Sequence, residues 1–291
     1  MAILIDKETK VVVQGITGTA GRAHVQTMRA FGTNIVAGTK PGTSGEEVDG
    51  IPVFSTVKEA IDKRGANTAI VFVPAKFAKA AALESINAGI KTIVVTPEHV
   101  PIQDTIEIIE TARKKGATII GPNTAGIIAP SSKIKVGFVP NKYYIPGNIG
   151  VASRSGTLLY ELGSRLTASG LGQSTCVGVG GDPIVGTRLA EVLKMFEKDP
   201  ETHAMLIIGE IGGTQEEEVA KLVSEGVIKK PVVAYIVGKS VPAGKRMGHA
   251  GAIMEGEHDT IESKINILKN AGIEVAETLQ QTIDLLRKYV T

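Results

Sequence analysis

A histidine between glycines, preceded by two cations, is the part of this sequence best suited to chemistry. His249 lies between Gly248 and Gly251, and Lys245 and Arg246 come shortly before it. Glycines leave space around the ring and let the backbone take conformations that other residues resist, while the cations suit an anion beside the ring. A neutral imidazole can be a base, a metal ligand or a nucleophile. A surface loop with an incidental histidine is the alternative, but so dense a pattern favours function.

A carboxylate after an apolar run is the second candidate. Glu210 follows the β-branched stretch of residues 204–208, among Gly209, Gly212 and Gly213. A glutamate with such neighbours has no evident packing role. It can accept an N–H from a histidine and so select the ring nitrogen that acts as the nucleophile. A solvated loop glutamate is the alternative.

A hydroxyl-rich turn predicts an anion site at the start of a helix. Residues 153–157 read Ser-Arg-Ser-Gly-Thr. Ser155 or Thr157 can cap the helix that follows, and the free N–H groups of Gly156 and Thr157 suit a phosphate or a carboxylate. Ser153 and Ser155 loosely resemble a hydrolase nucleophile, but Gly-x-Ser-x-Gly is absent. Residues 178–183 form another glycine-rich turn that could line a small carboxylate substrate.

A glycine turn near the amino terminus predicts a phosphate site. Gly15, Gly18 and Gly21 follow the run 11–13, where a strand would lead into a helix whose N-terminus receives phosphate. The spacing differs from the dinucleotide fingerprint, and residues 37–42 contain no acid for a nicotinamide ribose. This counts against NAD and suits a ligand with extra phosphate; a purely structural turn is the alternative. We expect His24 to pack or face solvent.

The overall composition describes a globular chain without an obvious nucleic-acid or membrane surface. It has 291 residues, 43% hydrophobic and 21% charged, with a net charge of +2. Its one cysteine, Cys176, allows neither a disulfide framework nor a cysteine-based zinc site, and fits a reducing compartment. No signal-peptide pattern is visible, and no apolar run approaches the roughly 20 residues of a membrane span. We therefore expect a cytoplasmic protein.

Short β-branched runs alternate with amphipathic stretches along the whole chain. This alternation predicts an α/β fold of two doubly wound domains, with mostly parallel sheets and ligands at the carboxyl ends of the strands. Residues 130–147 are rich in Pro, Gly, Lys and Tyr and interrupt the alternation. We expect one domain over residues 1–125, a linker over 126–147 and a second domain over 148–291.

These motifs together resemble the family of succinyl-CoA synthetase (succinate–CoA ligase) alpha subunits over essentially the full length. The matching segments are residues 3–7, 14–18, 51–54, 153–157, 172–178, 180–183, 195–200, 209–213 and 244–252. The resemblance implies a Rossmann-like coenzyme A (CoA)-binding domain, followed by a flavodoxin-like ligase domain that carries a phosphohistidine at His249. Glu210 would hold that histidine.

The family's other site residues carry over position by position. The resemblance implies that CoA contacts Thr17, Gly18, Thr19, Ala20, Thr96, Pro97 and Glu98. It implies that the helix start at Ser153, Ser155, Gly156 and Thr157 receives the phosphohistidine, and that Tyr160 lies near succinate. Two positions depart from the family: Thr43 stands in a loop that usually reads Pro-Gly-Lys-Gly-Gly, and Thr124 replaces a cysteine. At the first position a CoA phosphate contact is therefore either lost or taken over by Lys40, and at the second the cysteine is not expected to be required for chemistry.

The implied reaction is the reversible conversion of succinyl-CoA, nucleoside diphosphate and phosphate to succinate, CoA and triphosphate, a tricarboxylic acid cycle step. Mg²⁺ and the nucleotide would bind a separate ATP-grasp beta subunit, in an αβ or α2β2 assembly, and we expect no metal site on this chain. A ligase for malate or another acid would share every motif. A non-catalytic CoA-binding module would explain only the first domain, and the missing acid disfavours a dehydrogenase. Preference for ADP or GDP is not encoded here.

Overall fold

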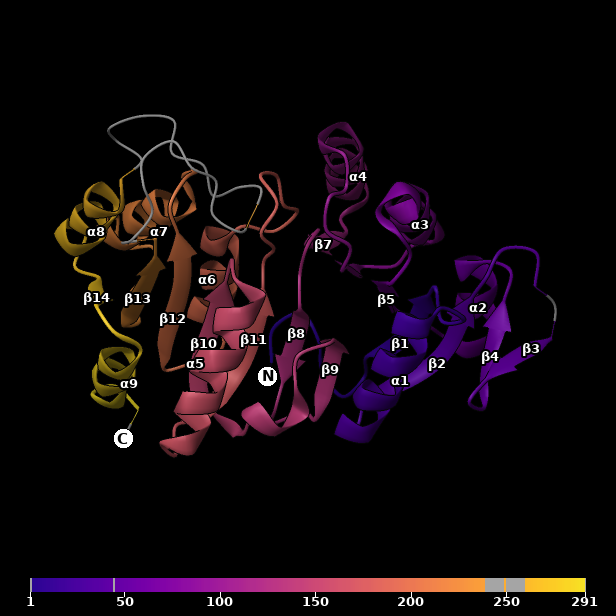
Figure 1. Ribbon diagram of the computed structural model, residues 1–291, viewed down its shortest axis with the longest axis horizontal. Coiled ribbons are helices and arrows are strands. Elements are labelled where there is room, and N and C mark those ends of the chain that lie inside the picture. Colours follow the sequence, from indigo (N-terminus) through magenta and orange to yellow (C-terminus); the bar gives the residue numbers. More distant parts are fainter. Residues whose placement is uncertain (1, 44, 239–248, 250–259, 291) are drawn as a thin grey trace.

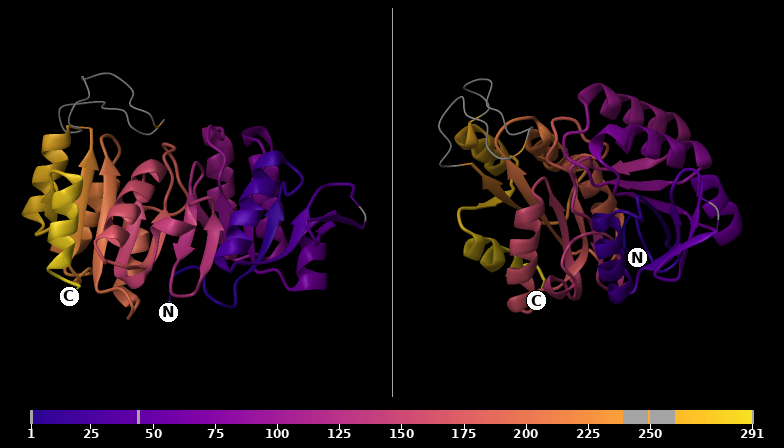
Figure 2. Two further views of the ribbon diagram at one scale, coloured as in Figure 1. Left: turned by 60° about the horizontal axis from the view of Figure 1, so that its bottom comes forward. Right: turned by 45° about the vertical axis from the view of Figure 1, so that its right-hand side comes forward.

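The computed structural model describes residues 2–43, 45–238, 249 and 260–290. In these residues, two seven-stranded sheets follow one another along the long axis of the molecule, with helices on both faces (Figures 1 and 2). The predicted α/β class with two doubly wound units is therefore confirmed. None of the described helices has the length and apolar character needed to cross a membrane.

The first sheet is parallel except at one edge. Its order is β3 (Glu46–Val48), β4 (Ile51–Phe54), β2 (Asn34–Thr39), β1 (Lys10–Gln14), β5 (Thr68–Val71), β6 (Thr92–Val95) and β7 (Thr118–Ile120). Only β3 runs antiparallel to its neighbour, β4. The helices are α1 (Thr19–Phe31), α2 (Val57–Arg64), α3 (Ala75–Ala88) and α4 (Ile102–Lys115).

The local sequence explains these elements. All four residues of β5 are buried, as expected for a central parallel strand that helices cover on both faces. Helix α2 begins where the Thr56 hydroxyl accepts a hydrogen bond from the Glu59 N–H (3.2 Å). It ends at Gly65, whose left-handed φ of 69° costs a glycine little.

The second sheet holds the C-terminal half of the chain. Its order is β14 (Glu274–Ala276), β13 (Val232–Val237), β12 (Ala204–Glu210), β10 (Pro146–Ser153), β11 (Gln173–Gly178), β8 (Gly126–Ala129) and β9 (Ile134–Gly137). The helices are α5 (Gly156–Ala168), α6 (Leu189–Lys198), α7 (Gln215–Ser224), α8 (Ile261–Asn270), α9 (Leu279–Arg287) and the 3-10 turn η1 (Asn141–Tyr143). Strands β10 to β14 pair in parallel.

The segment expected to be a linker, residues 126–147, departs from that expectation. It contains β8, β9, η1 and the start of β10, and the antiparallel pair β8–β9 extends the second sheet. Every residue of β8 and β9 is buried. The strands are only four residues long, so the prolines and lysines around them dominate the composition. This segment is therefore a packed hairpin at the edge of the second sheet rather than an irregular connection.

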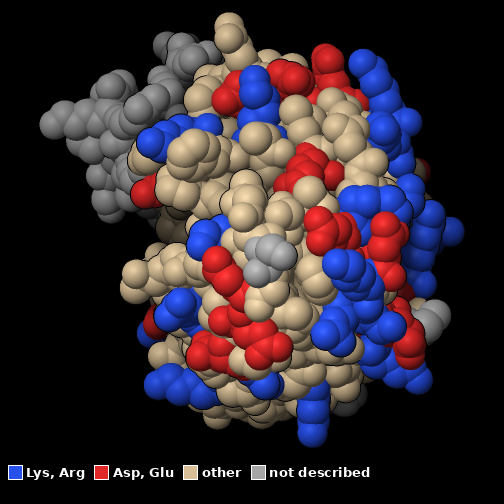
Figure 3. Space-filling model, turned by 90° about the vertical axis from the view of Figure 1, so that its right-hand side faces the viewer, with Lys and Arg blue, Asp and Glu red and all other residues tan. Residues whose placement is uncertain are grey.

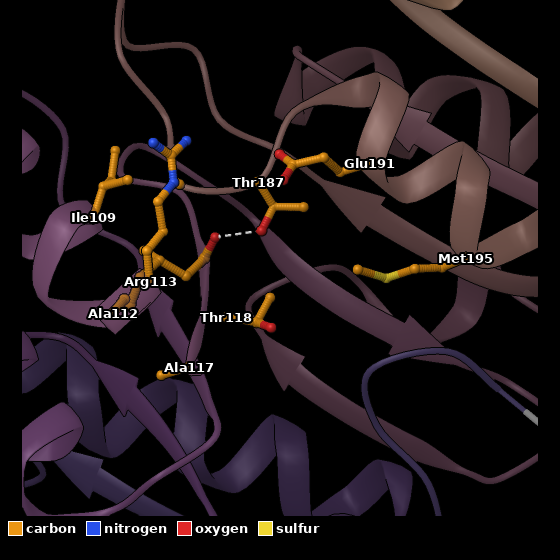
Figure 4. Close-up of a pocket in the computed structure, with 10 residues that line it drawn as sticks. Ile109, Ala112, Arg113, Ala117, Thr118, Thr187, Glu191 and Met195 are labelled. Atoms are coloured by element: carbon orange, nitrogen blue, oxygen red, sulfur yellow. Dashed lines mark hydrogen bonds between the residues drawn. The ribbon is translucent and has the colours of Figure 1, made fainter. Parts of the chain in front are cut away.

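The two halves meet along a hydrogen-bonded seam. Thr33, after α1, donates its hydroxyl to the Lys135 carbonyl of β9 (2.7 Å). On the other side, the Thr187 hydroxyl donates to the Ile119 carbonyl of β7 (2.7 Å; Figure 4). A cavity of about 100 Å³ lies there between α4, β7 and the start of α6. These contacts tie each sheet to the other half of the chain and thereby orient the strand ends described next.

Candidate active site

His249 and Glu210 are in direct contact, although 39 positions separate them in the sequence. Glu210 is the last residue of β12 and is 5% exposed. Its Oε2 lies 2.7 Å from His249 Nδ1. Because an ionised carboxylate can only accept, Nδ1 carries the proton in this contact, and we assign the lone pair to Nε2. The pair therefore presents a neutral imidazole with one defined nucleophilic atom.

In the described part of the chain, three charged groups influence the protonation of His249. The hydrogen bond that His249 donates to Glu210 raises the pKa of His249 above its ordinary value, whereas burial of the ring acts in the opposite direction. The charge of Arg154 also lowers this pKa, and that of Asp182 raises it. Since only the neutral ring is nucleophilic, the balance among these groups decides how much of the protein is reactive near neutral pH.

The turn after β11 forms one wall of the histidine site. A Cβ atom built on Gly181 would lie 2.6 Å from His249 Cγ, so the ring packs directly on the glycine backbone. Next to it, Asp182 accepts a hydrogen bond from the Asn123 amide (3.0 Å). Asn123 follows β7, so this bond joins the strand ends of both sheets. Sequence reasoning placed Gly181 in a turn that could line a small carboxylate substrate and assigned no role to Asn123; the spacing of neither one signals this contact.

The start of α5 has the geometry of an anion site. The Ser155 side chain caps the helix by accepting from the Leu158 N–H (3.3 Å). Ser153 is buried, and its hydroxyl donates to the Ser155 carbonyl (2.7 Å). Gly156 and Thr157 open the helix, and Thr157 is exposed. Of the two serines, one therefore shapes the turn and the other caps it, while the free N–H groups belong to Gly156 and Thr157.

Tyr160 lies one turn into α5, with a hydroxyl that lacks a partner. The oxygen is buried and makes no hydrogen bond to the described residues. Burial raises the pKa of this hydroxyl to about 12, so it stays protonated. A Cβ on Gly156 would come within 4.0 Å of the same oxygen. A buried unpaired donor costs free energy, and a ligand oxygen beside the start of α5 would satisfy it.

The first glycine turn leaves an exposed helix N-terminus. Gly18 precedes α1 without a side-chain cap, and Gly18, Thr19 and Ala20 are exposed, while Thr17 is half-buried. No acidic residue lies in the first turn of α1. Backbone N–H groups and the helix dipole therefore favour a phosphate here.

Thr96, Pro97 and Glu98 lie across a cavity from this turn. The cavity, of about 400 Å³, is lined by these three residues together with Ala20, His24, Phe72 and Phe138. The structure thus brings two predicted CoA-contact segments to one space. His24 also lines it, stacked on Phe72 with ring centroids 5.3 Å apart. Burial lowers the pKa of His24, so the ring is neutral, and its stacking on Phe72 agrees with the expectation that this histidine packs.

Lys40 and Thr43 lie in the turn after β2. Lys40 forms an exposed ion pair with Glu46 (3.2 Å), and Thr43 is buried with its hydroxyl unpartnered among the described residues. Pro41, between them, borders an apolar cavity of about 360 Å³ beside Gly15. Acidic and basic side chains are interspersed on this face of the first domain (Figure 3). Lys40 is thus the cation of this turn, and its pairing is weak because both partners are solvated.

No cluster of three or more His, Cys, Asp or Glu side chains suited to a metal ion occurs among the described residues. The acidic groups near His249 instead pair with nitrogen atoms, as in the contact between Glu210 and Arg154 (3.0 Å).

Comparisons with known proteins identify both halves of the chain. A family model described as a CoA binding domain matches residues 6–99, and one described as CoA-ligase matches residues 152–274. The chain is 50% identical to succinate–CoA ligase [ADP-forming] subunit alpha 2 of Archaeoglobus fulgidus, covering 98% of this chain and 99% of that protein. It is also 50% identical to succinate–CoA ligase [ADP-forming] subunit alpha of Aquifex aeolicus, and the alignment covers 95% of this chain and 91% of that protein.

A solved structure shows the same architecture within a longer protein. ATP citrate lyase of Methanosaeta concilii, in complex with (3S)-citryl-CoA, superposes with a TM-score of 0.90 at 25% identity. The match covers 98% of this chain and 50% of that one, so this chain spans half the length of that lyase. With two matched domains and relatives aligned from end to end, the chain belongs to the family of succinate–CoA ligase alpha subunits.

Proposed function

We propose that this chain is the alpha subunit of a succinate–CoA ligase that works through a phosphohistidine at His249. The contact between His249 Nδ1 and Glu210 Oε2 (2.7 Å) carries the proposal. It leaves Nε2 as a nucleophile and places a carboxylate where positive charge develops on the ring. The reaction converts succinate, CoA and a nucleoside triphosphate to succinyl-CoA, diphosphate and phosphate, and it is reversible.

In the first step, His249 Nε2 attacks the terminal phosphorus of the nucleotide in line. The N–P bond forms, the P–O bond to the diphosphate breaks, and the diphosphate leaves. The ring then carries a positive charge, because Nδ1 keeps its proton, and Glu210 compensates that charge. Mg²⁺ on the nucleotide would neutralise phosphate charge during this transfer.

In the second step, a succinate carboxylate oxygen attacks the phosphorus on His249. The N–P bond breaks, the imidazole becomes neutral again, and succinyl phosphate forms. The N–H groups of Gly156 and Thr157 at the start of α5 would hold the phosphoryl oxygens, with Ser153 and Ser155 shaping that turn. The buried Tyr160 hydroxyl would donate to the succinate.

In the third step, the CoA thiolate attacks the acyl carbon and phosphate leaves with the C–O electron pair. The CoA phosphates would bind Thr17, Gly18, Thr19 and Ala20, and its arm would follow the cavity past Thr96, Pro97 and Glu98. Lys40 would contact a further phosphate, with Thr43 buried beneath the same turn. CoA-binding chemistry would thus occupy residues 1–125, and phosphoryl chemistry residues 148–291.

The nucleotide and its Mg²⁺ would bind a separate ATP-grasp beta subunit. The names of the relatives as alpha subunits support this partner. We propose a cytoplasmic αβ or α2β2 assembly in which the beta subunit sets the preference for ADP or GDP.

Thioester formation by the purified complex tests this function. We expect co-expression with an ATP-grasp chain to yield a complex that forms acyl-CoA fastest from succinate among succinate, malate, glutarate and acetate. The measurement is kcat/KM for each acid at saturating CoA and nucleotide. Higher kcat/KM for malate would replace the substrate but keep the reaction class, whereas CoA binding without any thioester would leave only a CoA-binding module.

The pH dependence of phosphorylation tests the role of the neutral ring. Because Glu210 raises the pKa of His249, the reactive form is depleted at a higher pH than for an isolated histidine. We expect the single-turnover rate to fall about tenfold per pH unit on the acid side, with the midpoint above the ordinary histidine pKa of 6.5. Rapid-quench labelling between pH 5.5 and 8.5 measures this; a flat profile would contradict it.

A further inference from the structure

A row of buried charges leads away from His249 into the protein. Glu210 Oε1 lies 3.0 Å from Arg154 Nη2, and Arg154 Nη1 lies 3.0 Å from Glu216 Oε1. Beyond it, Glu216 Oε2 lies 2.8 Å from Lys264 Nζ. Side-chain exposure falls from 7% at Glu210 to 4% at Arg154 and 0% at both Glu216 and Lys264. The charges alternate in sign from the active site to α8.

Backbone contacts hold this row in place. Arg154 Nη1 also donates to the Gly212 carbonyl (2.9 Å), and Lys264 Nζ donates to the Gly213 carbonyl (2.7 Å) and to Glu217 (2.9 Å). Glu216 Oε1 further accepts from the Glu210 N–H (3.1 Å). Burial acts to raise the pKa of Glu216, but the charges of Arg154 and Lys264 lower it below its ordinary value. Glu216 is therefore held in its ionised form between Arg154 and Lys264.

Such a row is costly if its only role is to fill space. Each buried ion loses several kcal/mol of solvation, and apolar residues of similar volume often replace buried ion pairs without loss of stability. The row nevertheless ends on the carboxylate that holds His249. The two oxygens of Glu210 have different partners: Oε2 contacts His249 and Oε1 contacts Arg154. A change in the ion pair between Arg154 and Glu210 therefore also changes the negative charge that Glu210 presents to His249.

We propose that Glu216 and Lys264 are positioning residues that tune the proton affinity of His249 through Arg154 and Glu210. Glu216 attracts the Arg154 guanidinium and so weakens the ion pair between Arg154 and Glu210. Lys264 reduces this effect because it neutralises part of the charge of the Glu216 carboxylate. The consequence for catalysis rests on the proposed phosphohistidine function; the electrostatic effect on the ring does not.

Opposite electrostatic effects follow for the two residues. Among the residues that the structure describes, the charged groups that face His249 are Glu210 from β12, Arg154 from the turn after β10 and Asp182 from the turn after β11. With Glu216 neutral, Arg154 acts on Glu210 alone, so the imidazolium is less stabilised. With Lys264 neutral, the uncompensated Glu216 binds Arg154 more strongly, and Glu210 stabilises the imidazolium more. A role confined to packing would not produce opposite signs.

The test is an NMR titration of His249 in the full chain, assembled with its partner subunit and labelled with ¹⁵N-histidine. The chain has 5 histidines, and His249→Asn assigns the signal. We expect Glu216→Gln to lower the midpoint, Lys264→Met to raise it, and the double variant to return it close to that of the native protein, as a coupled pair should. For Lys264→Met, phosphorylation at pH 6 should be about threefold slower, a shift of roughly half a pH unit.

Lys135→Met is the matched control. Lys135 is also 0% exposed, but its ammonium donates to Thr27, Asn141 and the Val139 carbonyl at the seam between the sheets. The same truncation there should destabilise the fold without moving the His249 midpoint. If Lys264→Met fails to fold, the His249 midpoints of Glu216→Gln and of the double variant, in which both residues are neutral, still test the proposal.

The outcomes separate this inference from the proposed function. Opposite shifts in a chain that never becomes phosphorylated would support the tuning and refute the ligase mechanism. Normal phosphorylation with an unmoved midpoint in Glu216→Gln, or with equal shifts in Lys135→Met, would overturn the tuning and leave the mechanism standing.

Discussion

Substituting asparagine for His249 is expected to abolish transfer of labelled phosphate to this chain and to reduce ligase turnover by at least about 10⁴-fold. Asparagine keeps a polar group of similar reach that can still donate to Glu210, whose Oε2 lies 2.7 Å from Nδ1 in the native protein. It has no counterpart of the Nε2 lone pair, so no N–P bond can form. The measurement combines acid-labile ³²P incorporation from labelled triphosphate with steady-state thioester formation.

His203→Asn provides the matched control. His203 precedes β12, the strand that ends at Glu210, and among the described residues its ring hydrogen-bonds to the Asn148 amide (3.1 Å). The same substitution at the opposite end of the strand should leave labelling intact. Persistent acid-labile label on His249→Asn, at the level of the native protein, would rule out His249 as the carrier.

The second large effect is expected for Glu210→Gln, which should slow His249 phosphorylation roughly 10- to 100-fold at its pH plateau. The amide oxygen of glutamine can still accept the hydrogen bond from the Nδ1–H of His249, so the ring keeps its orientation. What is lost is the negative charge that compensates the ring once Nε2 has bonded to phosphorus. Because Glu210 also raises the pKa of His249, its removal should move the acid limb of the rate profile to lower pH while the plateau falls.

A lower plateau together with a displaced acid limb distinguishes the loss of the carboxylate charge from a mere change in packing. Glu161→Gln is a suitable control, because Glu161 lies on the exposed face of α5 in an ion pair with Arg165 (2.7 Å), and such pairs contribute little. Single-turnover rates between pH 5.5 and 8.5, with thermal unfolding of each variant, make the comparison. An unchanged plateau in Glu210→Gln would remove this residue from the mechanism.

Much of the fold follows from local patterns. The β-branched runs at residues 11–13 and 204–208 lie in β1 and β12, and the glycine turns lie at the carboxyl ends of those strands. The hairpin β8–β9 escaped prediction because four-residue strands surrounded by prolines and lysines have too few positions for a period to show. The antiparallel strand β3, Glu46–Val48, was likewise missed: two of its three residues are exposed acids.

Sequence by itself determined the candidate residue types: a histidine among glycines, a carboxylate at the end of β12, and hydroxyls at the start of α5. Only the tertiary structure decided that Glu210 meets His249, that Gly181 supports the ring, and that Arg154, Glu216 and Lys264 form one row. Of the three successive glutamates at 216–218, Glu216 is 0% exposed, whereas Glu217 and Glu218 are half-buried. The period of apolar residues in the sequence indicates which face of each segment is buried. The neighbours of a side chain depend instead on strand order and on packing between segments distant in the sequence.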